Sequence, residues 1–387
     1  MRCLFFDCPV TVGVKHPTLE TISATLRSVG GNTGNILFRY GIASSILDEL
    51  TPCHWAEGQT LAAIEEFDAV VIGAANWLST FHDNGNERRA HILRHLDKPT
   101  ICIGLGIQSS IRTSKKLEFP QGAIDLLAAL RDVEATVLVR DEFTYDQCIH
   151  HGLTNLAVIG CPSSFIDISP SQADTLIAKS SNHKLLERVT LNHGYIRRDI
   201  CLHDSALLKS VCETRGQYIV QDNLNGEINA AIEAAHPSLS THSPNLRRPR
   251  FLISPKSQIK QNLSTARHNL RVYFNALQWI DSLRSSSVVL GTRIHGCIAA
   301  LQAGTPSAIT TIDSRTQGLA ETLGIPRVKI SALNPLSRKI RPIDIIDEAG
   351  IGFAPYLRRR RELLSIYKQN LRGFGLTLSP RLQDFTD

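Results

Sequence analysis

Short apolar segments of strand length alternate with amphipathic segments of helix length along the first part of the chain. Continuous apolar runs, as expected for strands buried on both faces, occur at Cys3–Phe6, Ala69–Ile72, Thr100–Ile103, Ala135–Val139 and Leu156–Ile159. Apolar residues recur at helical spacing in the segments Asn35–Leu50, Gln121–Leu130 and Thr144–His151. This alternation is typical of a parallel sheet that is covered by helices on both faces.

The same alternation begins again after a polar, weakly patterned stretch at Pro170–Lys184, which we interpret as an interdomain connection. Strands are expected at Arg188–Asn192, Gln217–Val220, Val288–Leu290 and Pro306–Ile312, and helices at Ser205–Thr214, Asn269–Arg284, Cys297–Ala303, Thr316–Leu323 and Leu357–Leu371. Asn223–Leu263 is crowded with prolines and is predicted to be a long irregular excursion. The pattern therefore predicts an α/β fold with two Rossmann-like domains that face each other across a cleft.

The composition is consistent with this fold and excludes several other classes of protein. Hydrophobic residues make up 42% of the chain and charged residues 20%, which is typical of a globular protein. The apolar runs are too short to cross a bilayer or to form a signal-peptide core, so a cytoplasmic location is expected. The nine cysteines are an odd number without a Cys-x-x-Cys pair, so neither a zinc site nor a disulfide framework is expected.

The net charge of +6 is concentrated in three arginine-rich patches, at Arg247–Arg250, Arg338–Arg341 and Arg358–Arg361. Because aromatic residues are not interleaved with these arginines, we expect no nucleic-acid partner. The patches are compatible with an anionic substrate and with peripheral association with the inner face of a membrane. The sequence gives no indication of the oligomeric state.

The segment Val288–Ala300 has the strongest candidate chemistry. A buried strand ends at Gly291 and a helix begins near His295, so Arg293 and His295 should lie beside the N–H groups of a helix start. An arginine offers a rigid fork for phosphate or carboxylate, and a histidine exchanges protons near neutral pH. An arginine paired with a surface carboxylate beside a helix-capping histidine is the structural alternative, and the spacing alone does not decide between them.

Further candidate residues follow buried strands or lie in the glycine-rich loop before the first helix. They are Gly31, Asn32, Gly34, Asn35, Asn76, Gly106, Gln108, Arg140, Asp313 and Arg315. The loop leaves room for a ligand near a helix start, the amides suit sugar hydroxyls, and the arginines suit an anion. Ordinary turns, close helix–strand packing and helix caps such as Asp141 remain as structural alternatives. The sequence contains no metal-ligand spacing, nucleophile elbow or nucleotide fingerprint.

Several short motifs occur in a recognisable order, at Gly30–Asn35, Val139–Thr144, Gly160–Ser163, Thr292–Gly296, Gly304–Pro306 and Asp313–Arg315. Together they resemble the polysaccharide pyruvyl transferases, and the resemblance runs with gaps from about Gly30 to about Pro326. The resemblance implies a two-domain fold similar to that of GT-B glycosyltransferases. Residues 1–170 would form the acceptor side, residues 185–335 the donor side, and residues 336–387 a helical segment.

The resemblance also implies the chemistry. A pyruvyl group would pass from phosphoenolpyruvate to two hydroxyls of a sugar in a cell-surface glycan or its precursor, forming a ketal and releasing phosphate. By position, Arg293 would hold the phosphate or carboxylate of the donor, and His295 would be the general acid that protonates its methylene carbon. Phosphoenolpyruvate and a sugar acceptor are thus the expected partners, and no metal or cofactor is expected. A glycosyltransferase that uses a nucleotide sugar and a non-catalytic glycan-binding protein of the same fold are the alternatives.

Overall fold

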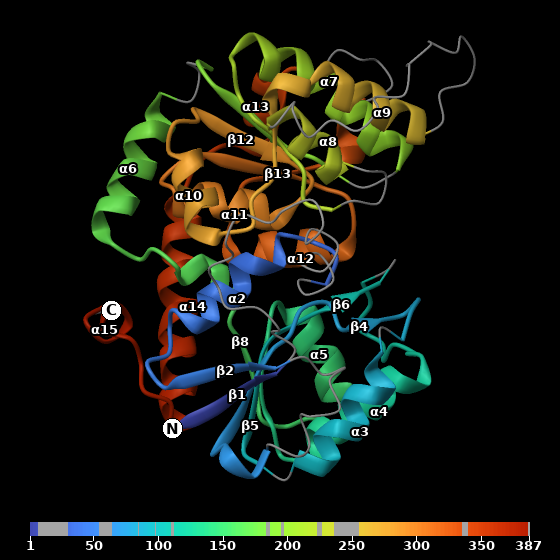
Figure 1. Cartoon of the computed structure of the whole chain (residues 1–387), viewed down its shortest axis with the longest axis vertical. Coiled ribbons are helices and arrows are strands. Elements are labelled where there is room, and N and C mark those ends of the chain that lie inside the picture. Colours follow the sequence, from blue (N-terminus) through green and yellow to red (C-terminus); the bar gives the residue numbers. More distant parts are fainter. Residues whose placement is uncertain are drawn as a thin grey trace.

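The computed structural model contains two sheets of parallel strands, each with its helices, and they lie one after the other along the long axis of the molecule (Figure 1). The structure describes residues 1–6, 30–53, 64–83, 85–96, 98–109, 112–182, 186–194, 197–222, 227–235, 255–334 and 340–385. Within these ranges, no helix combines the length and the apolar character that crossing a membrane requires. The cysteines within them are free thiols.

The first sheet has six parallel strands in the order β2-β1-β3-β5-β7-β8. Its elements are β1 (Arg2–Phe6), α2 (Asn35–Ala43), β2 (Glu49–Cys53), β3 (Ala69–Gly73), α3 (Asn86–Leu96), β5 (Thr100–Leu105), α4 (Gln121–Asp132), β7 (Thr136–Val139), α5 (Glu142–His150) and β8 (Leu156–Val158). Alternate residues of the central strands enter different cores, so Val71 packs with α2 while Val70 packs with α3 and α4. Burial on both faces explains why these strands are continuous apolar runs.

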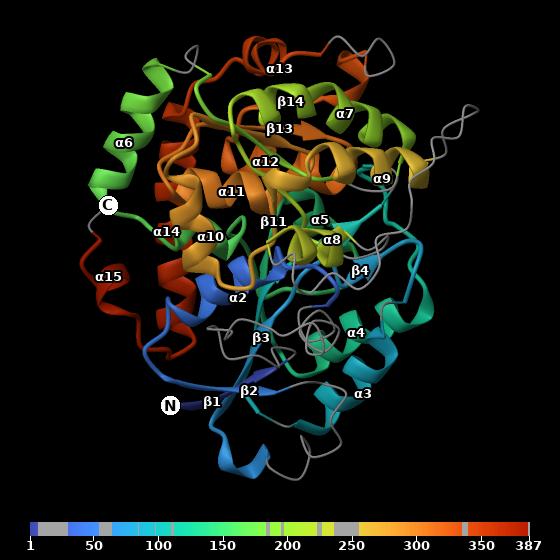
Figure 2. The same ribbon diagram turned by 45° about the horizontal axis from the view of Figure 1, so that its top comes forward.

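The second sheet also has six parallel strands, in the order β11-β10-β9-β12-β13-β14. Its elements are β9 (Val189–Asn192), α7 (Arg198–Glu213), β10 (Tyr218–Ile219), α8 (Glu227–Ala235), α9 (Pro255–Thr265), β11 (Leu270–Arg271), α10 (Ala276–Leu283), β12 (Val288–Gly291), α11 (Ile294–Gln302), β13 (Ser307–Thr311), α12 (Ser314–Leu323) and β14 (Arg327–Lys329). Helices α7 and α9 lie side by side at the outer end of the molecule (Figures 1 and 2). A separate pair of short parallel strands, β4 (Leu78–Ser79) and β6 (Ile107–Gln108), extends from the first sheet.

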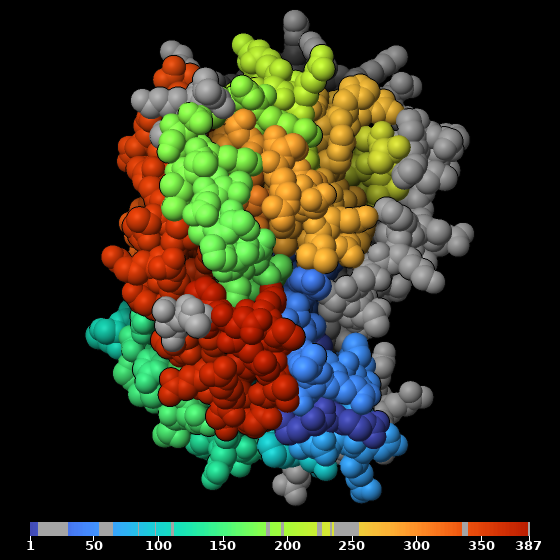
Figure 3. All heavy atoms as spheres, turned by 90° about the vertical axis from the view of Figure 1, so that its left-hand side faces the viewer, coloured from blue at the N-terminus to red at the C-terminus, as the bar shows by residue number. Residues whose placement is uncertain are grey.

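The C-terminal helices join the two sheets. These helices come after the second sheet and are α13 (Pro342–Ala349), α14 (Ala354–Gly373) and α15 (Pro380–Gln383). The helix α6 (Pro170–Ser181) lies between the two sheets in the chain. Leu363 and Tyr367 of α14 belong to one hydrophobic core that contains residues of both sheets. After α14 the chain returns to the first sheet, where Arg381 donates a 2.7 Å hydrogen bond to Ser44 Oγ. Figure 3 shows this red C-terminal segment against the blue N-terminal part of the chain.

The predicted α/β architecture with parallel sheets is confirmed, and several predicted boundaries are corrected. Pro170–Lys184 does lie between the last strand of the first sheet and the first strand of the second, but most of it is the helix α6. Ser169 caps this helix by accepting a hydrogen bond from Gln172 N (3.3 Å). The helix predicted at Asn269–Arg284 begins only at Ala276, and the short strand β11 precedes it. Within Asn223–Leu263, α8 and α9 are regular, while residues 223–226 and 236–254, with Arg247–Arg250, lie outside the described residues.

Candidate active site

Arg293 and His295 lie where β12 ends and α11 begins, as predicted. Gly291 ends the strand with φ +145°, and a Cβ there would lie 2.5 Å from the carbonyl oxygen of Asn192 on β9. Only glycine fits such a close approach of two strands. The turn places Arg293 at the N-cap of α11, where its buried guanidinium forms an ion pair with the largely buried carboxylate of Asp222. Sequence analysis did not identify this acidic partner.

His295 lies in the first turn of α11 and is largely enclosed. Its Nε2 lies 3.8 Å from Cys161 Sγ, and its ring centroid lies 5.9 Å from that of Phe38. Burial lowers the pKa of His295 well below its ordinary value, and the positive charges of three arginines, Arg140, Arg315 and Arg293, lower it further. The imidazole is therefore neutral at neutral pH when the site holds no anion.

The first sheet contributes Arg140 from the carboxyl end of β7. Its Nη1 donates to Asn76 Oδ1 (3.3 Å) and its guanidinium carbon lies 5.2 Å from the centroid of the Phe38 ring. The side chain is 2% exposed, yet its Nε and Nη2 have no hydrogen-bond partner among the described residues. Gly106 leaves space beside it, because a Cβ there would lie 3.1 Å from Arg140 Cδ. A buried guanidinium with free N–H groups is suited to an anionic ligand.

Arg315 is the third cation of the group. It lies in the first turn of α12, 3.5 Å from Asp313, and its charge lowers the pKa values of both His295 and Arg140. Asp313 caps α12 by accepting a 2.8 Å hydrogen bond from Thr316 N. The structure therefore brings Arg140, Arg293 and Arg315 around His295, while Asp313 has a structural role as a cap beside them.

The glycine-rich loop joins the two sheets at this point. Thr33 N donates to the carbonyl oxygen of Gln221 (2.8 Å), and Asn32 Oδ1 accepts from Gly34 N (2.7 Å). A Cβ on Gly34 would lie 2.7 Å from Gln221 Oε1 and 3.0 Å from His295 Nδ1. The backbone of this loop thus closes directly over the histidine, in agreement with the expected close approach.

The remaining predicted residues are Gly31, Asn35 and Gln108. Among the described residues, Gly31 has no neighbouring atom within 4 Å of the position that its Cβ would take, and Asn35 begins α2 with its amide near Gly30. Gln108 belongs to the short strand β6, where its carbonyl oxygen accepts from Thr80 N (3.1 Å). For these three residues, a part in substrate binding stays a prediction.

Sequence analysis missed several residues that the fold brings to the site. Cys161 lies within the motif Gly160–Ser163, and Asp222 follows a predicted strand, so both had a positional signal. Phe38 had none beyond its place on an amphipathic helix. Buried polar atoms without hydrogen-bond partners among the described residues also occur nearby, at Thr33 Oγ1 and Gln221 Nε2. In the part of the chain that the structure describes, no group of three or more His, Cys, Asp or Glu residues could hold a metal ion.

Comparisons with known proteins give one family match and several weak structural similarities. The model of a family described as polysaccharide pyruvyl transferase matches residues 2–314. No curated protein sequence matches the chain. Among solved structures, Anabaena HepE in complex with UDP and glucose is 12% identical, with 95% of this chain and 100% of that chain covered and a TM-score of 0.41. A putative UDP-N-acetylglucosamine 2-epimerase from Listeria monocytogenes is 13% identical, with 88% and 86% covered and a TM-score of 0.39. These structural similarities are low, and the two parallel sheets themselves establish the fold class.

Proposed function

Because the chain belongs to the polysaccharide pyruvyl transferase family, we propose that it transfers a pyruvyl group from phosphoenolpyruvate to a sugar. Two hydroxyls of a cell-surface glycan or its precursor would be joined in a ketal, and inorganic phosphate would be released. The observation that supports this proposal is that Arg140, Arg293 and Arg315 lie near enough to His295 for their charges to lower its pKa. Three guanidinium groups around one imidazole match a donor that carries a phosphate, a carboxylate and a carbon that must be protonated.

The arginines have the role of holding the donor. Two nitrogens of the buried Arg140 side chain have no hydrogen-bond partner among the described residues, and a phosphate or carboxylate would satisfy them with charge-assisted hydrogen bonds. Arg293 stands at the N-cap of α11, where free backbone N–H groups and the helix dipole add to the attraction of an anion. The two arginines come from different sheets, so the donor would lie between them.

His295 has the role of general acid. The donor brings negative charge next to the imidazole, which raises the pKa that the arginines lower in the free protein. The resulting imidazolium would donate its proton to the methylene carbon, leaving a positively charged central carbon. One sugar hydroxyl attacks this carbon and returns a proton to His295. Phosphate then leaves, and the second hydroxyl closes the ketal while its proton passes to the phosphate.

Neutral polar groups have the role of binding the acceptor. The amide of Asn32 belongs to the glycine-rich loop, that of Asn76 follows β3, and that of Gln108 lies on β6. Thr33 Oγ1 and Gln221 Nε2 are buried without hydrogen-bond partners among the described residues, and hydroxyl groups of a sugar would supply them. This assignment extends the predicted acceptor side across the loop to Gln221.

The location of the reaction is a separate part of the proposal. A cavity of about 540 Å³ lies between α6 and α14, with apolar residues such as Ile177 and Leu357 and the exposed Arg358 and Arg361 in its lining. Arg360 is instead buried and bonded to Gln172 Oε1 (2.6 Å). Association of this face with an anionic membrane surface at its inner leaflet would bring the protein to a lipid-linked acceptor. Co-sedimentation with anionic vesicles, lost in an Arg358→Gln/Arg361→Gln variant, tests this association.

Thermal unfolding with and without ligands tests the donor. Phosphoenolpyruvate at about 100 times its Kd should stabilise the protein by about 2.7 kcal/mol, whereas nucleotide sugars should have no effect. Arg140→Gln should abolish the shift, and Arg94→Gln, which removes an exposed arginine of α3, should retain it. Stabilisation by a nucleotide sugar alone would instead favour a glycosyltransferase.

Turnover tests the general acid. His295→Ala should lower the rate of phosphate release by roughly two to four orders of magnitude and leave donor binding largely intact. Arg293→Ala should weaken donor binding as well, because it removes a charge-assisted contact. Wild-type turnover in the His295→Ala variant would contradict the assigned role.

A further inference from the structure

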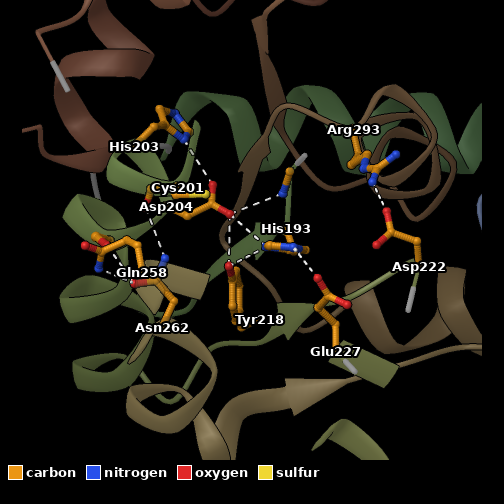
Figure 4. A network of polar contacts seen from close by, with 12 residues as sticks. His193, Cys201, His203, Asp204, Tyr218, Asp222, Glu227, Gln258, Asn262 and Arg293 are labelled. Carbon is orange, nitrogen blue, oxygen red and sulfur yellow. Dashed lines mark hydrogen bonds and ion pairs between the residues drawn. The ribbon is translucent and has the colours of Figure 1, made fainter. Parts of the chain in front are cut away.

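A second group of buried ionisable residues lies beside the donor site, at the carboxyl ends of three neighbouring strands. Asn192, the last residue of β9, is paired with Ile219 of β10 on one side and with Gly291 of β12 on the other. His193 follows β9 directly, Asp222 follows β10, and Arg293 follows β12. His193 therefore lies just beyond the end of β9, the strand between those that position Asp222 and Arg293 (Figure 4).

His193 is held by contacts from three elements. Its Nδ1 lies 3.1 Å from Asp204 Oδ2 of α7 and 2.6 Å from the hydroxyl of Tyr218, which itself donates to Asp204 (2.9 Å). Its Nε2 lies 3.8 Å from Glu227 Oε1 at the start of α8. Gly194 N donates to the same Asp204 oxygen (3.2 Å), so the carboxylate fixes both the ring and the following backbone.

The surroundings of His193 favour its charged form. Burial alone would lower the pKa of His193, but the hydrogen bond to Asp204, the nearby carboxylate of Glu227 and the charges of Asp204 and Asp222 raise it to about 9. Burial would raise the pKa of Asp204, but hydrogen bonds from His193 and His203 hold it well below its ordinary value. At neutral pH the cluster thus contains a buried imidazolium in contact with Asp204 and Glu227, while Asp222 forms its ion pair with Arg293.

We propose that His193 is a positioning residue of the donor site, a fixed positive charge that offsets the neighbouring carboxylates and keeps Arg293 available to the anionic donor. Without this charge, the region around Asp204, Glu227 and Asp222 would become more negative by one unit. Arg293 would then be drawn to the carboxylates, and an anionic donor would be repelled. This inference rests on the proposed function in taking phosphoenolpyruvate as the ligand of Arg293.

A change of charge at His193 tests the proposal in the full-length protein. His193→Gln keeps hydrogen-bonding capacity but removes the charge, and should raise the Kd and the KM for phosphoenolpyruvate by about tenfold or more. Turnover at saturating donor should change less, because His193 does not touch the reacting atoms. His193→Lys restores the positive charge and should recover most of the affinity. Equal donor affinity in wild type and a folded His193→Gln variant would overturn the proposal.

His203 offers the matched control. Its Nδ1 lies 3.3 Å from the other oxygen of Asp204, and its Nε2 bonds to Thr310 Oγ1 (3.1 Å), on the side of Asp204 away from Arg293 (Figure 4). His203→Gln should lower the melting temperature without changing donor affinity. If the role of His193 were purely structural, His193→Gln and His193→Lys would weaken donor binding equally. That result would also contradict the proposal.

Inorganic phosphate separates this inference from the proposed function. If wild-type protein binds phosphate but not phosphoenolpyruvate, the assigned donor is wrong, and weaker phosphate binding by His193→Gln still supports the positioning role. If phosphate binds equally to wild type and to His193→Gln, the positioning role is wrong whatever the donor is. If wild-type protein binds neither anion, both proposals are wrong.

Discussion

At the scale of single residues, His295 has surroundings that oppose the charge that its proposed role requires. Burial and the charges of Arg140, Arg315 and Arg293 lower its pKa, so the free protein holds a neutral imidazole at neutral pH. A general acid must carry a proton when the donor is in place. The two requirements are compatible if donor binding itself raises the pKa, since the phosphate and carboxylate offset the three guanidinium charges.

Proton uptake on donor binding is therefore expected. Because the pKa of His295 is low in the free protein and higher in the complex, donor affinity should be highest at low pH. It should fall as pH rises from the free-protein pKa to the pKa of the complex. Calorimetry in buffers of different ionisation enthalpy measures the protons taken up. His295→Gln removes the contribution of the histidine and leaves that of the donor's own phosphate, so identical uptake in both proteins would contradict the prediction.

At the scale of elements, the strand-to-helix turn at Arg293 was predictable because a buried apolar strand, a glycine and a helix start follow one another in the sequence. The polar helix α6 was missed because only Gln172 and Leu176 are buried on it, which leaves almost no apolar period. Short edge strands such as β11 were missed because their pairing partners decide their conformation. The contact between Cys161 and His295 joins segments far apart in the chain, and local pattern contains no information about it.

Asp313 caps α12 and was also predicted to bind substrate, and two substitutions can separate these roles. Asp313→Ala removes the hydrogen bond to Thr316 N and should lower the free energy of unfolding by about 0.5–2 kcal/mol. Asp313→Ser keeps a capping oxygen and should retain most of the stability, while it frees Arg315 from a neighbouring carboxylate. Denaturant unfolding measures the stability, and a phosphoenolpyruvate titration measures the affinity. Weaker donor binding by the serine variant would show that Asp313 takes a direct part in the site, as the sequence suggested.

At the scale of the whole molecule, the site exists only because the two sheets are held together. Arg140 comes from the first sheet and Arg293 from the second. One hydrophobic core contains Ile101 of the first sheet, Ile309 of the second and Leu363 of α14. Since this core crosses the boundary between the sheets, separating them would expose a large apolar surface. We therefore expect the two sheets to unfold together.

Two buried tryptophans can report on this cooperativity. Trp77 belongs to the core of the first sheet and Trp279 to that of the second, so variants in which the other tryptophans are replaced by phenylalanine give one probe for each. Both probes should show the same denaturation midpoint, as a two-state transition requires. Phosphoenolpyruvate should move both midpoints equally, because it would bind arginines of both sheets. A donor-induced shift of the Trp279 midpoint alone would mean that the second sheet binds the donor independently and that Arg140 takes no part in binding.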